Sequence, residues 1–146
     1  MNKIGQYTHE HTKKWTSEIA SYGGYIFITP EYNYGIPGST KNAVDYLYHE
    51  IQFKPAVITS YGIQGGKIAN EALKVTLEGM KLRVAKTRIH LPFHGGLGPD
   101  AYAAGQGALG EDTKNDWEKE QKPEVLKALG ELEKLLKEPN PDQVKN

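Results

Sequence analysis

The sequence predicts an α/β fold, in which an open parallel sheet carries helices on its faces. Predicted helices and short apolar strands alternate along the chain, which implies crossover connections and parallel strands. Two of the strands, 25–29 and 55–60, are apolar on both faces, as strands buried in a parallel sheet are. Each of these strands leads into a loop that contains tyrosine and at least two glycines before the next helix. The length of 146 residues fits one domain.

Helices are predicted where apolar side chains recur every three or four residues. Four segments show this spacing: 12–22, 42–50, 68–80 and 123–137. Gly23 and Gly24 end the first of them. In the third helix we expect four residues to face the core: Ile68, Ala72, Val75 and Leu77.

The strands are short β-branched runs that glycine or proline interrupts. The strand 25–29 stops at Pro30, and the strand 55–60 opens on a proline. A third strand, bent in the middle, is expected from 82–85 and 87–91. The Gly- and Ala-rich segment 94–110 is expected to be a loop.

The charge divides the chain into two parts of one domain. Residues 1–110 contain 11 Lys and Arg against 8 Asp and Glu, and residues 111–146 contain 7 Lys against 10 acidic residues. We interpret 1–110 as a flavodoxin-like domain that is shortened at its N-terminus, for reasons given below. We interpret 111–146 as the charged amphipathic helix and tail of the same domain.

Composition excludes several classes of function. Lys and Arg equal Asp and Glu at 18 each, which argues against a nucleic-acid partner and against binding to an anionic membrane surface. The chain has no cysteine, which rules out a disulfide framework and a thiolate nucleophile and is compatible with the cytoplasm. It has no apolar run long enough to span a bilayer, and its start lacks the apolar core of a secretory signal.

We assign no metal site and no catalytic side chain from the sequence. His90 and His94 are four residues apart, but Pro92 between them argues against a shared helical face. No third metal ligand is evident, and no Ser/His/Asp relay can be assembled.

Two loops are the candidate site. The loops 30–38 and 60–67 follow consecutive strands, so they are expected side by side at the carboxyl edge of the sheet, where ligands bind in such folds. Their flat side chains and free backbone donors suit a planar heteroaromatic ligand, although a rigid turn with packed tyrosines is an equal alternative. The second loop is not a P-loop, because Ile68 stands where that motif needs Ser or Thr. It does not match the dinucleotide fingerprint either.

The motifs in these loops resemble those of the NADPH-dependent FMN reductase family, which has the flavodoxin-like fold. The resemblance covers about residues 7–95 and rests on Pro-Glu-Tyr-Asn at 30–33, Lys-Asn-Ala-Val-Asp at 41–45, and Ser-Tyr-Gly at 60–62 followed by two glycines. It implies FMN as cofactor, NADPH as hydride donor and a flavin or quinone as acceptor. It also implies that ten residues bind the flavin ring: Pro30, Glu31, Tyr32, Asn33, Tyr34, Ser60, Tyr61, Gly62, Gly65 and Gly66.

The chain departs from the family pattern at its start. Family members begin with a strand and a Ser/Arg-rich loop that binds the FMN phosphate, and neither is evident here. We therefore expect the equivalents of strands 3, 4 and 5 only, with 25–29 at an open edge. We expect a homo-oligomer in which a partner chain covers this edge; the alternatives are that the N-terminal lead-in folds over it or that the sequence is incomplete. The alternative hypotheses are a diverged, truncated relative that acts as a ligand-binding or interaction subunit, and a fragment that is unstable alone.

Overall fold

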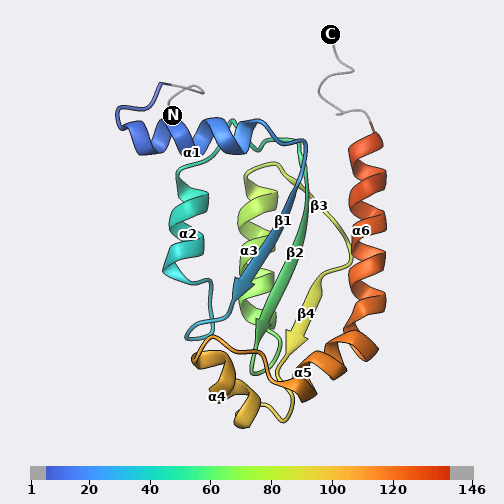
Figure 1. The fold of residues 1–146 in the computed structure, drawn as a ribbon. Coiled ribbons are helices and arrows are strands. Elements are labelled where there is room, and N and C mark those ends of the chain that lie inside the picture. Colours follow the sequence, from blue (N-terminus) through green and yellow to red (C-terminus); the bar gives the residue numbers. More distant parts are fainter. Residues whose placement is uncertain (1–5, 139–146) are drawn as a thin grey trace.

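The computed structural model describes residues 6–138 and contains an open parallel sheet flanked by helices (Figure 1), which confirms the predicted architecture. The long central strand pairs with one strand on one side and with two short strands in succession on the other. These short strands are the two halves of the predicted bent strand. The strands are β1 (Tyr25–Pro30), β2 (Pro55–Gly62), β3 (Arg83–Val84) and β4 (Ile89–Pro92), and β2 is the central one.

Helices cover the sheet on both faces (Figure 1), and a short π-helical segment joins two of them. They are α1 (Glu10–Ala20), α2 (Gly38–Asp45), α3 (Lys67–Gly79), α4 (Pro99–Gly105), α5 (Glu111–Asp116), the π-helix η1 (Trp117–Gln121) and α6 (Lys122–Lys137). None of the helices in the described part of the chain is long and apolar enough to cross a membrane.

The core has two halves because side chains alternate between the faces of β2. Ala56 and Ile58 point toward α2 and α3, where they meet Leu73 and Leu77. Val57 points the other way, into a second apolar cluster. The buried members of this cluster are Val57, Ala85, Ile89, Ala128 and Leu132, the last two from α6. This sandwich fixes the carboxyl ends of the strands, which point toward α4 and α5 (Figure 1).

The prediction of a helix over 42–50 was wrong in its bounds. The helix α2 begins at Gly38, directly after Pro37, and ends at Asp45. Beyond it the buried carboxylate of Glu50 accepts hydrogen bonds from the Tyr48 backbone N–H at 3.0 Å and from the Tyr7 hydroxyl at 2.9 Å. These bonds hold the chain in a turn where the apolar spacing indicated helix.

The expected inner face of α3 was right at Leu77 and wrong at Ile68 and Val75. The helix buries Ala69, Leu73 and Leu77, whereas Ile68 and Val75 are exposed. Both sets of residues have helical spacing, and the α3 face that meets the sheet is set by the turn that enters the helix. Gly66, in that turn, has a φ of 67°.

The segment 94–110 is not a continuous loop, because α4 forms within it. Pro99 occupies the start of this helix, where its missing N–H costs nothing, and three alanines follow within the helix. Helical structure also begins earlier than predicted in the C-terminal part, at Glu111 rather than at 123.

The strand β1 lies at an open edge, as predicted, since it pairs only with β2 among the described strands. Tyr25 and Phe27 pack against the core, but Ile26 is 50% exposed and Ile28 is 67% exposed. The expectation that this strand is buried on both faces is therefore wrong for the described part of the chain.

Candidate functional site

The loop after β1 folds into a tight hairpin. Tyr32 and Gly35 exchange two backbone hydrogen bonds, of 3.2 Å and 3.1 Å. The two residues between them have positive φ values, 50° for Asn33 and 60° for Tyr34, as a two-residue type I′ turn requires. Asparagine tolerates this conformation, whereas a bulky residue such as tyrosine is strained in it. The turn leaves the rings of Tyr32 and Tyr34 exposed to solvent.

This hairpin lies directly beside the loop after β2, as the sequence predicts. Pro30 is in register with Tyr61, and the Glu31 backbone N–H donates to the Tyr61 carbonyl at 3.2 Å. A Cβ atom placed on Gly62 would lie 4.0 Å from the Glu31 Cβ. We call residues 30–35 and 60–66 together the paired loops.

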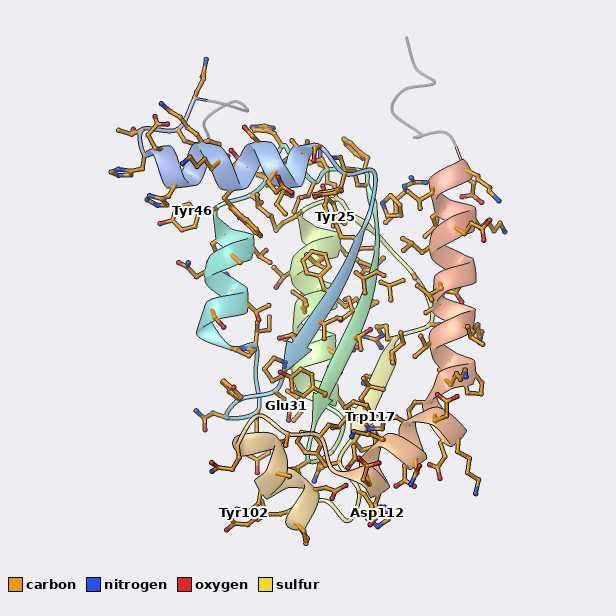
Figure 2. The ribbon with its side chains drawn as sticks, in the orientation of Figure 1. Tyr25, Glu31, Tyr46, Tyr102, Asp112 and Trp117 are labelled. Atoms are coloured by element: carbon orange, nitrogen blue, oxygen red, sulfur yellow. The ribbon has the colours of Figure 1, made fainter. Side chains whose placement is uncertain are left out.

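The carboxylate of Glu31 joins the hairpin to α3. One of its oxygens accepts hydrogen bonds from the backbone N–H groups of Ile68, at 2.8 Å, and Ala69, at 3.0 Å. These N–H groups are in the first turn of the helix, where no intrahelical acceptor exists, and a negative charge there is favoured by the helix dipole. In Figure 2, Glu31 lies at the carboxyl end of β1.

The glycines of the second loop are required by its shape. Gly62, Gly65 and Gly66 have φ values of 151°, 77° and 67°, which glycine adopts freely. A Cβ on Gly66 would lie 2.8 Å from the Ser60 Cβ and 3.0 Å from the Tyr61 carbonyl oxygen. The backbone at Gly66 therefore lies so close to the end of β2 that a side chain at this position would collide with Ser60.

A buried polar network supports this turn from inside. The Ser60 hydroxyl donates to the Gly65 carbonyl at 2.7 Å and accepts from the Asn70 side-chain amide at 3.0 Å. His90 Nδ1 is 3.2 Å from the same hydroxyl. Because Ser60 is fully buried and its proton is used within the turn, its hydroxyl is a structural support rather than a nucleophile.

Aromatic rings form a wall next to the paired loops. Phe93 packs edge-on against Tyr61, with ring centroids 6.4 Å apart, and stacks on Trp117 at the same separation. The Trp117 indole N–H donates to the Pro92 carbonyl at 2.6 Å, which fixes the π-helix on β4. Glu31 and Trp117 are at the same end of the sheet in Figure 2.

The two histidines that the sequence places four residues apart have separate partners. His90 contacts Ser60, whereas His94 Nδ1 is 2.6 Å from a carboxylate oxygen of Asp116. The hydrogen bond to Asp116 raises the pKa of His94. Nearby, the Asp100 carboxylate accepts from the hydroxyl of Thr113 at 2.6 Å and from its backbone N–H at 2.7 Å, and these bonds attach α4 to α5.

The structure thus brings all ten residues of the predicted site into two adjacent loops, with exposed tyrosine rings on one and a glycine turn on the other. These features fit a planar ring that stacks on flat side chains and receives hydrogen bonds from loop backbone. Sequence reasoning missed the support from Asn70, His90 and Phe93. For Asn70 a signal was available: a polar residue at helical spacing from the apolar Leu73 and Leu77.

Comparisons with known proteins agree with this geometry. The sequence model of the family described as NADPH-dependent FMN reductase matches residues 1–93. The NAD(P)H-dependent FMN reductase ntnL of a Nectria species is 53% identical over 137 residues, which are 92% of this chain and 67% of that protein. An NAD(P)H-dependent FMN reductase of Schizosaccharomyces pombe is 50% identical over 84 residues, which are 58% of this chain and 42% of that protein.

Solved structures share the fold. FerB, a flavoenzyme NAD(P)H:(acceptor) oxidoreductase from Paracoccus denitrificans, has a TM-score of 0.55 at 22% identity, covering 91% of this chain and 75% of that one. An oxidoreductase from Corynebacterium diphtheriae has a TM-score of 0.63 at 19% identity, covering 90% of this chain and 64% of that one. The chain is therefore shorter than the relatives it matches.

Proposed function

Because this chain belongs to the NADPH-dependent FMN reductase family, we propose that it is an NAD(P)H-dependent oxidoreductase that reduces flavin or a quinone. The observation that carries the proposal is the bond from the Glu31 N–H to the Tyr61 carbonyl, which holds the two predicted ring-binding loops together. FMN, when bound, accepts a hydride from the reduced nicotinamide and passes two electrons to the acceptor, which also takes up protons.

The chain's own residues bind and orient the ring. We assign one side of the ring to the hairpin, Pro30 to Tyr34, where the exposed rings of Tyr32 and Tyr34 offer flat apolar surface. We assign the pyrimidine edge to Tyr61 and Gly62 and to the turn made by Gly65 and Gly66, which the buried hydroxyl of Ser60 supports from beneath. Orientation of two planar reactants is the main contribution that such a site makes.

The test is to purify the full chain with excess FMN and to measure its visible spectrum and the rate of NADPH oxidation. We expect retained flavin and turnover above that of free FMN. Tyr32→Ala should weaken flavin binding, whereas Tyr22→Ala should not. Tyr22 is a suitable control because it is also an exposed tyrosine but precedes β1, at the opposite end of that strand. No retained flavin together with no added turnover would contradict the proposal.

We further propose that a second copy of the chain covers the open edge of β1. Peptide groups alternate along a strand, and the Glu31 N–H points to β2, so the N–H and C=O groups of Ile26 and Ile28 point outward. Unpaired backbone groups beside exposed isoleucines favour pairing with another strand. The second candidate function is that of a subunit that binds partners through this edge. We propose the cytoplasm as its compartment.

Light scattering tests the role of this edge. Ile28→Lys should give monomers where the unaltered chain forms dimers, because a charge at an edge strand opposes pairing. Val75→Lys is the matched control, since Val75 is 64% exposed and lies on α3, away from the edge. A strictly monomeric unaltered chain would refute the pairing of two copies.

A further inference from the structure

A cavity of about 400 Å³ lies behind the glycine turn of the second loop, at the carboxyl ends of β2 and β4. It is open to solvent and is lined by Gln64, Lys67, His90, Pro92 and Gln121. The turn separates it from the hairpin: a Cβ on Gly65 would lie 3.1 Å from the His90 Cβ, whereas a Cβ on Gly62 would face Glu31. The cavity therefore adjoins the proposed ring site without being part of it.

The cavity lining contains one cationic side chain, Lys67, and no acidic one. Among the described residues the Lys67 ammonium has no hydrogen-bond or ion-pair partner, whereas Arg88 behind it is paired with Glu71. Burial lowers the pKa of His90, and the positive charges of Arg88 and Lys67 lower it further, against smaller opposing effects of a hydrogen bond to the Gly65 backbone and of Glu71. Glu31, the other nearby carboxylate, is engaged by the backbone N–H groups of α3.

The hydrogen bonds of His90 leave one ring nitrogen for a ligand. The Ser60 hydroxyl donates to the Gly65 carbonyl and accepts from Asn70, and in this arrangement its remaining lone pair accepts from His90 Nδ1–H. This fixes the proton on Nδ1 and leaves Nε2 without a partner among the described residues. When an anion binds and Nε2 takes up a proton, Nε2 becomes a second charged donor beside Lys67.

Gln121 is an uncharged polar residue of the cavity lining. Its side-chain oxygen, Oε1, is buried and has no donor among the described residues. Because this oxygen is enclosed, Gln121 lines the cavity through the rest of its side chain. Gln121 is also the last residue of the π-helix η1, and such segments occur often at functional sites.

We propose that this cavity binds a phosphate group attached to a ribose, as in the 2′-phosphate end of NADPH. Lys67 and His90 Nε2 hold the phosphate, and the ribose lies against the part of the cavity lining that Gln121 forms. The assignment to NADPH rests on the proposed reductase function. The same anion chemistry would also accept a free phosphate ion, and the experiment separates these two sources.

The first arm measures binding without any activity. The His90 ring resonance of the full chain is followed by NMR while adenosine 2′,5′-bisphosphate, and separately inorganic phosphate, is added. We expect the nucleotide to shift the resonance. Lys67→Gln should weaken this binding at least tenfold, because it removes one charge-assisted hydrogen bond. Lys74→Gln, the same charge change two turns along α3 at a lysine already paired with Glu78, should leave it unchanged.

The second arm measures turnover. Lys67→Gln should raise KM for NADPH at least tenfold and leave KM for NADH unchanged, because NADH lacks the 2′-phosphate. If inorganic phosphate shifts His90 but the nucleotide does not bind more tightly, or KM for NADPH does not change, the NADPH assignment is overturned. If neither compound shifts His90, the phosphate site itself is overturned. A chain without turnover of either NADPH or NADH would refute the reductase function, while the NMR arm would still decide whether the cavity binds phosphate.

Discussion

The Glu31 carboxylate accepts a hydrogen bond from the Ile68 backbone N–H at 2.8 Å, across 37 residues of sequence. Through this bond the hairpin after β1 is fixed to the first turn of α3. The same residue donates its own backbone N–H to Tyr61. One glutamate therefore sets the position of the hairpin relative to both the central strand and the helix.

Removal of this carboxylate should lower stability and loosen the site. Glu31→Ala deletes the acceptor for two helix N–H groups, and we expect a loss of about 1–2 kcal/mol in the free energy of unfolding, with weaker flavin binding. Glu31→Gln keeps one oxygen acceptor and should recover part of both effects. Denaturant unfolding and flavin titration measure them. Equal effects of the two variants would show that the hydrogen bonds to α3 are not the cause.

We expect Tyr34 to lower the stability of the folded chain and to strengthen flavin binding. Tyr34→Gly removes the strain of a positive φ and should stabilise the chain by about 1 kcal/mol, while loss of the ring weakens flavin binding. Tyr34→Ala is the control, because it loses the ring but keeps the unfavourable φ. The two variants should thus differ in their unfolding temperature and have the same affinity for flavin. A Tyr34→Gly chain no more stable than Tyr34→Ala would refute the strain argument.

Two glycine substitutions should act in opposite directions. Gly66→Ala forces a side chain into a backbone at φ 67° and within 2.8 Å of Ser60, so we expect a loss of at least about 2 kcal/mol. Gly130→Ala, in α6 with open space around it, should stabilise by about 0.5–1 kcal/mol. Denaturant midpoints give both values, and a tolerated Gly66→Ala would mean that the turn is not as tight as described.

The pair formed by His94 and Asp116 should make stability depend on pH. The bond to Asp116 raises the pKa of His94 in the folded chain above its ordinary value of 6.5. The stabilisation is therefore fully present below pH 6.5 and is lost as the pH rises through the pKa of the folded state. Asp116→Asn should destabilise the chain more at about pH 5.5 than at about pH 9. The same difference at both values would exclude this ion pair as the source.

Local patterns were sufficient for the strands and the candidate loops. The β-branched runs bounded by proline predict β1 and β2, and the order of elements predicts that the loops after them lie side by side. The resemblance to flavin reductases follows from residues that are contiguous in the chain. For these features the information is local, because period, propensity and turn chemistry act over a few residues.

Local patterns were not sufficient where two arrangements were equally apolar or where a polar group found its partner far along the chain. For α3, the expected face contained Ile68 and Val75, and the observed face contains Ala69 and Leu73 in their place. Both faces include Leu77 and fit helical spacing, and the packing of the helix on the sheet selected between them.

The sequence by itself determined the sheet, the order of its strands and the position of the candidate site. Only the tertiary structure decided that Glu31 binds the start of α3, that Ser60 is a buried support and that Lys67, His90 and Gln121 share a cavity. The physical reason is that a hydrogen bond or a charge acts through space, over a few ångströms, between residues whose separation along the chain carries no periodic signal.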